Sequence, residues 1–145
     1  TRRLDLRAAA YTGLRLPTLN ELYRPFVVFP VRTDANAALD NERLEGFEIG
    51  LDWQPVNAIV VSVTAFDNEV KDAIANVTVG PNLRRRENVP AIKARGIEAS
   101  VAAKFGAVSL DGGLAWTDAE VRGGTGPAAA LDGNRPAQTP EFAAT

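Results

Sequence analysis

The segment EGFEIGLDWQ, Glu45 to Gln54, determines the fold class. Every second position in it carries a large apolar side chain: Phe47, Ile49, Leu51 and Trp53. Glycine and polar residues occupy the positions between them. A strand places these two sets on opposite faces, whereas helical spacing would mix them. The segment therefore predicts a β-strand with one apolar face.

The same period of two recurs on both sides of this segment. Apolar and polar residues alternate over residues 4–11, 59–65, 97–105 and 108–117. The connections QPVN at 54–57 and FGA at 105–107 are short and have the composition of tight turns. These patterns predict antiparallel hairpins joined into an all-β meander of about five or six strands.

The other connections are expected to be long, at Leu16–Arg43, Ala75–Pro90 and Gly123–Pro136. Long and short connections alternate along the chain, so the short turns fall at one end of the sheet and the long loops at the other. Outer-membrane barrels have this arrangement, with short periplasmic turns and long extracellular loops. Strands with one buried face alternate in the same way in soluble proteins, so a soluble β-sandwich binding module, of carbohydrate-binding type, is the alternative.

The composition excludes several classes of site. The 145 residues include no Cys and no His, which rules out disulfides, thiolate metal sites and a Ser-His-Asp triad. We therefore expect no catalytic residues, no metal site and no cofactor. The net charge of −2 argues against a nucleic-acid partner, because nucleic-acid-binding domains are usually basic.

The segment TGLRLPTLNELYRPF, Thr12 to Phe26, resembles the TonB-dependent outer-membrane receptors. Those receptors often carry a run of the type Gly-Phe-Arg-Ala-Pro-Thr-Leu-x-Glu-Leu-Tyr. Further pieces resemble the family in the same order, including a Glu-x-Gly strand and a Gly-x-Glu strand. The family-motif residues expected to have structural roles are Gly13, Arg15, Pro17, Glu21, Tyr23, Glu48, Gly50, Gly96 and Glu98.

The resemblance implies a 22-stranded outer-membrane barrel, of which residues 1–145 are one part. The family's plug domain and energy-coupling box are N-terminal and are not in this chain, and position 1 is not Met. We therefore expect an internal piece of a receptor from the outer membrane of a Gram-negative bacterium. The implied function is TonB-energised uptake of a scarce nutrient, with a ferric siderophore as the commonest ligand. The implied partners are lipid, the plug, the TonB protein and the ligand.

In this interpretation each face of the sheet has its own environment. The apolar face would contact lipid: Phe47, Ile49, Leu51, Val61, Val63, Ile97, Val101 and Leu114. The opposite face would contact the lumen and form cross-strand ion pairs: Asp5, Arg7, Glu48, Asp52, Glu98, Lys104 and Asp111. Glycines on the strands are expected to ease bending of the wall. Trp53 and Phe105 would form the lower aromatic girdle and Trp116 part of the upper one.

Two segments in the expected loops are singled out. PTLNELY, at 17–23, has Pro at its start and Glu in the first turn, which predicts a short helical turn that shapes its loop. Arg84, Arg85 and Arg86 form a basic run that could attract an anionic ligand. The alternative for this run is an ordinary solvated loop.

Overall fold

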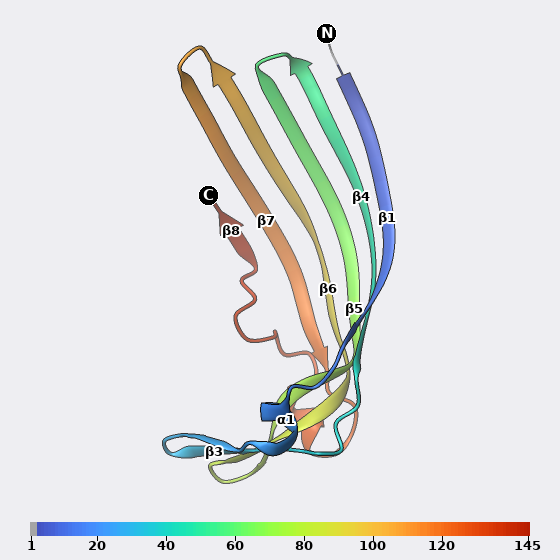
Figure 1. Ribbon diagram of the computed structural model, residues 1–145, viewed down its shortest axis with the longest axis vertical. Helices are drawn as coiled ribbons and strands as arrows, with labels where there is room; N and C mark the ends of the chain where they lie inside the picture. The colour runs from blue at the N-terminus through green and yellow to red at the C-terminus, as the bar shows by residue number, and fades with distance from the viewer. Residues whose placement is uncertain (1–2) are drawn as a thin grey trace.

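The computed structural model describes residues 3–145, so residues 1 and 2 of the predicted domain lie outside the described part. Long strands dominate the structure (Figure 1): β1 (Arg3–Arg15), β4 (Glu42–Val56), β5 (Ile59–Gly80), β6 (Leu83–Phe105) and β7 (Val108–Arg122). The shorter elements are β2 (Phe26–Val28), β3 (Val31–Asp34), β8 (Phe142–Ala144), the helix α1 (Leu19–Tyr23) and the 3-10 helix η1 (Gly126–Leu131). Neither helix within residues 3–145 has the length and apolar content needed to cross a membrane.

The long strands form one antiparallel sheet in the order β1, β4, β5, β6, β7, which we call the wall. β8 adds to the edge of β7 by pairing Leu114 with Ala144. The sheet is curved and is not closed (Figure 1). The predicted all-β antiparallel architecture is confirmed.

The two short turns lie at the same end of the sheet, at the top of Figure 1. Asn57 and Ala58 connect β4 to β5, and Gly106 and Ala107 connect β6 to β7. Gly106 has a φ of 63°, a left-handed conformation that glycine adopts without a steric cost. The predicted positions of both short turns are confirmed to within a few residues.

The expected long loop at Ala75–Pro90 is wrong. β5 continues to Gly80 and β6 begins at Leu83, so only Pro81 and Asn82 connect them. Backbone pairing continues without a shift from the wall to Thr78 and Arg84. Gly80, Pro81 and Asn82 therefore mark a tight turn at the tip of a long hairpin. We call residues 73–89, which lie beyond the wall, the hairpin extension.

Loop residues 16–41 are fixed against this extension. β3 pairs with β6 in parallel, with Arg32 opposite Leu83, and β2 pairs with β3. The side-chain amide of Asn36 donates to the carbonyl of Arg86 (2.9 Å). The backbone amide of Asp40 donates to the side-chain oxygen of Asn88 (2.8 Å). The loop is therefore hydrogen-bonded to the hairpin at several points along its length.

No described part of the protein covers the apolar face of the wall. The exposed fractions are 51% for Phe47, 49% for Ile97 and 60% for Leu114. The apolar residues of neighbouring strands lie side by side and form continuous rows. In one such row, Leu51 lies between Leu6 and Val63. A soluble sandwich would bury this face against a second sheet, so that alternative is not favoured.

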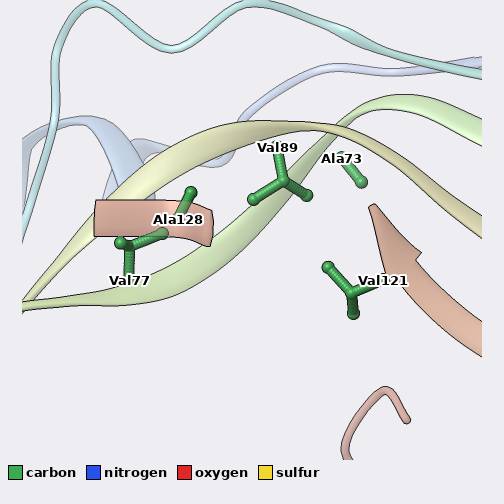
Figure 2. Close-up of a cluster of buried hydrophobic side chains, with 5 residues drawn as sticks. All are labelled: Ala73, Val77, Val89, Val121 and Ala128. Carbon is green, nitrogen blue, oxygen red and sulfur yellow. The ribbon is translucent and has the colours of Figure 1, made fainter. Parts of the chain in front are cut away.

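The buried core lies beyond the exposed apolar rows, on the hairpin extension (Figure 2). It consists of Ala73, Val77, Val89, Val121 and Ala128. Ala73 and Val77 have no exposed surface, and Val89 is 1% exposed. η1 packs Ala128 against β5 and also contacts β7, so it supplies the second layer of this core (Figure 2). The cluster therefore attaches the loop of residues 123–136 to the hairpin extension.

Candidate functional site

Arg7 of β1 lies on the polar face of the wall, the face that was expected to line the lumen; we call it the lumenal face. Its Nε lies 3.2 Å from Oδ2 of Asp52, and Nη1 lies 3.8 Å from Oε1 of Glu48. Its Nη2 also donates to the hydroxyl of Thr64. One guanidinium on β1 therefore contacts both β4 and β5, so the expected cross-strand ion pairs form for Arg7, Glu48 and Asp52. Asp5 instead pairs with Arg3 on its own strand, and Glu98, Lys104 and Asp111 form no ion pair among residues 3–145.

Glycines on this face make room for large neighbours. A Cβ at Gly50 would lie 2.6 Å from Cζ of Arg7, and one at Gly46 would lie 2.3 Å from the ring of Tyr11. A Cβ at Gly96 would meet Phe66. The two family-motif glycines, Gly50 and Gly96, thus leave space for side chains of the adjacent strand, a different role from the strand bending that we expected.

Glu98 also lies on the lumenal face, opposite Thr64. No hydrogen bond or ion pair links its carboxylate to any residue among 3–145. A hollow of about 370 Å³ adjoins it and is lined in part by Arg7, Ser62, Thr64 and Ser100. Arg7 is already paired with two carboxylates, of Glu48 and Asp52, and Glu98 lines the same hollow without a cation of its own. The surface around the hollow therefore carries excess negative charge.

The family-motif segment forms a second cluster where β1 meets α1. Arg15 donates from both terminal nitrogens to the carboxylate of Glu21, at 3.1 and 3.2 Å. Its Nε also pairs with the buried carboxylate of Glu42. The other oxygen of Glu42 accepts the backbone amide of Ile74 (2.7 Å). Arg15 thereby connects α1 to the point where the hairpin extension begins.

A capping box begins α1 and confirms the predicted helical turn. The backbone amide of Glu21 donates to the hydroxyl of Thr18 (3.3 Å), and Glu21 accepts the backbone amide of Thr18 (2.7 Å). This reciprocal bonding satisfies backbone donors at the helix start that would otherwise be unpaired. The Thr-x-x-Glu spacing at 18–21 is the sequence signal for this capping box, and it adds to the signals of Pro17 and Glu21.

Electrostatics strengthen the same cluster. Burial raises the pKa of Glu21, but the hydrogen bonds from Arg15 and Thr18 outweigh it and lower this pKa to about 2. The hydrogen bonds to Glu42 and Glu21 raise the pKa of Arg15 above its usual value. Both groups therefore remain charged at neutral pH.

The remaining family-motif residues have weaker structural roles. Tyr23 is 66% exposed, and Pro17 precedes the N-cap of α1. A Cβ at Gly13 would lie 3.5 Å from Cβ of Leu44, an ordinary contact, so glycine is not sterically required there.

The three consecutive arginines have different environments. Arg86 donates to the carbonyls of Asn20 and Arg24, and its guanidinium lies 5.1 Å from the ring centre of Phe26. Arg85 pairs with Glu87. Arg84 is exposed and has no ion pair or hydrogen bond with a described side chain. The structure therefore does not bring the three together as one site.

Metal ligation is not indicated in the described residues. No group of three or more acidic, His or Cys side chains within residues 3–145 could hold a metal ion.

The comparisons with known proteins agree with this geometry. The family model described as "TonB dependent receptor-like, beta-barrel" matches residues 1–145. The chain belongs to this family. Its members are outer-membrane transporters and receptors of Gram-negative bacteria rather than enzymes. No curated protein matches the chain.

Solved structures of receptors share the fold of this wall. A siderophore receptor PirA from Pseudomonas aeruginosa superposes with a TM-score of 0.63 at 20% identity, over 80% of this chain and 22% of that one. The FrpB iron transporter from Neisseria meningitidis has a TM-score of 0.58 at 21% identity, over 81% and 17%. The copper transporter OprC has a TM-score of 0.61 at 18% identity, over 81% and 18%. The chain thus spans about a fifth of each receptor.

Proposed function

We propose that this chain forms part of the wall of a receptor that takes up a ferric siderophore by TonB-energised transport. The observation that carries this proposal is the two-faced sheet: an uncovered apolar face opposite a charged lumenal face. Membership of the receptor family supports the transport mechanism. Similar structures described as siderophore and iron receptors support the choice of ligand.

Copper is a less suitable ligand for this segment. Cu ions prefer thiolate, thioether and imidazole ligands, and the sequence has no Cys, Met or His. The similarity to a copper transporter therefore extends to the fold but is not matched by ligating side chains in this part of the barrel.

Among the three arginines, Arg84 is the best candidate for contact with an anionic ligand. Arg84 and Arg86 lie on one face of β6 and Arg85 on the other, because side chains alternate along a strand. Arg86 is held by the backbone near α1, and Arg85 is paired with Glu87. The exposed guanidinium of Arg84 remains able to bind a carboxylate or catecholate group.

The lumenal carboxylates are suited to contact with a plug domain. Glu98 and its neighbours form an acidic surface with too few cations of its own. Cationic side chains of a plug would neutralise it, and movement of the plug, driven by TonB, would then break these contacts to release the ligand.

The proposal is tested on the full-length receptor that contains this segment. Binding of ferric catecholate and hydroxamate siderophores is measured by fluorescence quenching, with Cu²⁺ as the competing ligand class. We expect one ferric siderophore to bind and TonB-dependent uptake of radioactive iron to follow. Saturable binding of Cu²⁺ without any ferric siderophore would contradict the proposed ligand.

A matched pair of variants tests the residue assignment. Arg84→Gln should raise the siderophore Kd about tenfold, the effect of losing one charge-assisted hydrogen bond. Arg85→Gln removes the same charge one residue away, on the opposite face, and should leave the Kd unchanged. Equal effects of both variants would show that Arg84 has no specific contact.

A further inference from the structure

The candidate ligand residue Arg84 has a neighbouring strand that is not part of the wall. β6 pairs with β5 on one side and, in parallel, with β3 on the other, where Thr33 lies opposite Arg84. Thr33 is only 3% exposed, so β3 packs closely beside this position. β3 and its partner β2 therefore form one side of the surroundings of Arg84.

Strand pairing alone holds this side weakly. Three residue pairs join β3 to β6, from Arg32 opposite Leu83 to Asp34 opposite Arg85. β2 and β3 have three and four residues, and an isolated two-stranded hairpin is marginally stable in water. Contacts from other parts of the structure are therefore needed to keep β2 and β3 against β6.

Arg86 supplies several of these contacts. Its guanidinium donates to the backbone carbonyls of Asn20 and Arg24, at 3.1 Å for Arg24. The same group lies 5.1 Å from the ring centre of Phe26, at the start of β2. The carbonyl of Arg86 accepts the side-chain amide of Asn36, which follows β3 (2.9 Å). Arg86 thus contacts the chain on both sides of the β2–β3 hairpin, where α1 and β3 lie at the end of the sheet opposite the short turns (Figure 1).

The positive charge of Arg86 completes α1. The carbonyls at the C-terminal end of a helix carry partial negative charge, which a nearby cation stabilises. α1 contains no basic residue of its own, and the guanidinium from β6 takes this place. Arg86 is therefore engaged within the protein, whereas Arg84, on the same face of β6, is exposed.

We propose that Arg86 is a positioning residue for the ligand site at Arg84. It caps the C-terminal end of α1 and thereby holds β2 and β3 beside Arg84, so that the ligand meets a preformed site. The inference rests on the proposed uptake of a ferric siderophore, and it gives Arg86 no contact with that ligand. The apparent affinity of a site falls with the fraction of molecules in which the site is formed, so loss of Arg86 weakens binding indirectly.

The test uses the full-length receptor that contains this segment. Amide hydrogen exchange over residues 19–34 and the Kd of ferric catecholate and hydroxamate siderophores are measured. Arg86→Gln should speed this exchange about tenfold, because charge-assisted hydrogen bonds are lost, and should raise the Kd about fivefold. Arg86→Lys keeps a cation that can donate to both carbonyls, and should restore most of both values. Mobility of the unheated barrel on a gel verifies folding.

A double-mutant cycle separates positioning from general destabilisation. Because Arg86 acts through the site at Arg84, Arg86→Gln should change the Kd less than about twofold in an Arg84→Gln background. The control Arg85→Gln removes an equal charge from the opposite face of β6. It should alter neither the exchange nor the Kd.

Each outcome decides the proposal. Faster exchange with an unchanged Kd would show that Arg86 only stabilises the segment, and a raised Kd with unchanged exchange would show direct contact with the ligand. Either result, or an equal effect of Arg86→Gln in both backgrounds, would overturn the positioning role. A wild type that binds neither siderophore class would contradict the proposed function itself, and the inference with it. If Arg86→Gln does not fold, Phe26→Leu, which removes the ring contact, is tested in the same way.

Discussion

The ring of Phe66 on β5 lies directly over Gly96 on β6. A Cβ on Gly96 would lie 2.7 Å from Cζ of Phe66 and 2.3 Å from the backbone carbonyl oxygen of Trp116. The aromatic side chain can turn away, but the backbone carbonyl cannot move without disturbing the pairing of β6 with β7. Glycine is therefore required at this position by its neighbours.

Replacement of Gly96 should destabilise the barrel. Gly96→Ala is expected to lower the free energy of unfolding by about 2–3 kcal/mol, because it overpacks a fixed backbone contact. Gly50→Ala is the matched control, since its Cβ would meet the movable side chain of Arg7, and it should cost less than about 1 kcal/mol. Urea unfolding of the full-length receptor measures both. Equal losses would show that backbone crowding is not the cause.

Loss of the Arg15 guanidinium should release α1. Arg15→Gln removes the ion pairs to Glu21 and Glu42 and leaves the buried Glu42 carboxylate without a cation. We expect a loss of about 1–3 kcal/mol in local stability, seen as faster amide hydrogen exchange over residues 18–24. Arg24→Gln, in which the backbone contacts of Arg24 are kept, should leave this exchange unchanged. Unchanged exchange in Arg15→Gln would contradict the structural role.

The Glu21 carboxylate should make stability depend on acid. Its pKa falls from an ordinary 4.5 to about 2 in the folded protein. A lowered folded pKa means that its stabilisation is complete above about pH 4.5 and is lost as the pH falls toward 2. The urea midpoint of the wild type should therefore approach that of Glu21→Gln as the pH is lowered from 5 to 2. A difference that is constant with pH would exclude this linkage.

The apolar face should reject charge in a depth-dependent way. Leu51 lies among the inner apolar rows, between Leu6 and Val63 on the neighbouring strands. Leu51→Arg should cost about 2–4 kcal/mol in lipid vesicles, the usual cost of Arg near the bilayer midplane. Ser100→Arg adds the same side chain on the lumenal face and should cost less. A similar loss for both would argue against contact of Leu51 with lipid.

The strands of the wall were predictable because each of their faces has one environment. An uncovered apolar face on one side and a charged face on the other give a period of two that is evident from Phe47 to Trp53. Phe66 is a large apolar residue outside this alternation, because it points to the lumenal face and fills the space above Gly96. A single sequence does not show that a glycine on one strand leaves space for a large side chain on the neighbouring strand.

The hairpin extension was missed for a related reason. Residues 75–90 contain Pro, Gly, Asn and three consecutive arginines, a composition that is typical of a loop. They are held by contacts that are distant in the chain, from Asn36, Asp40 and Ala128. The different environments of Arg84, Arg85 and Arg86 also depend on these tertiary contacts and were not predictable from the sequence.

The shared register of β5 and β6 has a mechanical consequence. Pairing continues in register to Thr78 and Arg84 and is missing on the way only at Asp72 and Pro90, where Asp72 has a φ of 54° and Pro90 has no N–H to donate. A force on the hairpin tip is therefore transmitted along both strands into the wall. Any bending of the tip relative to the wall is expected at this one break in the ladder.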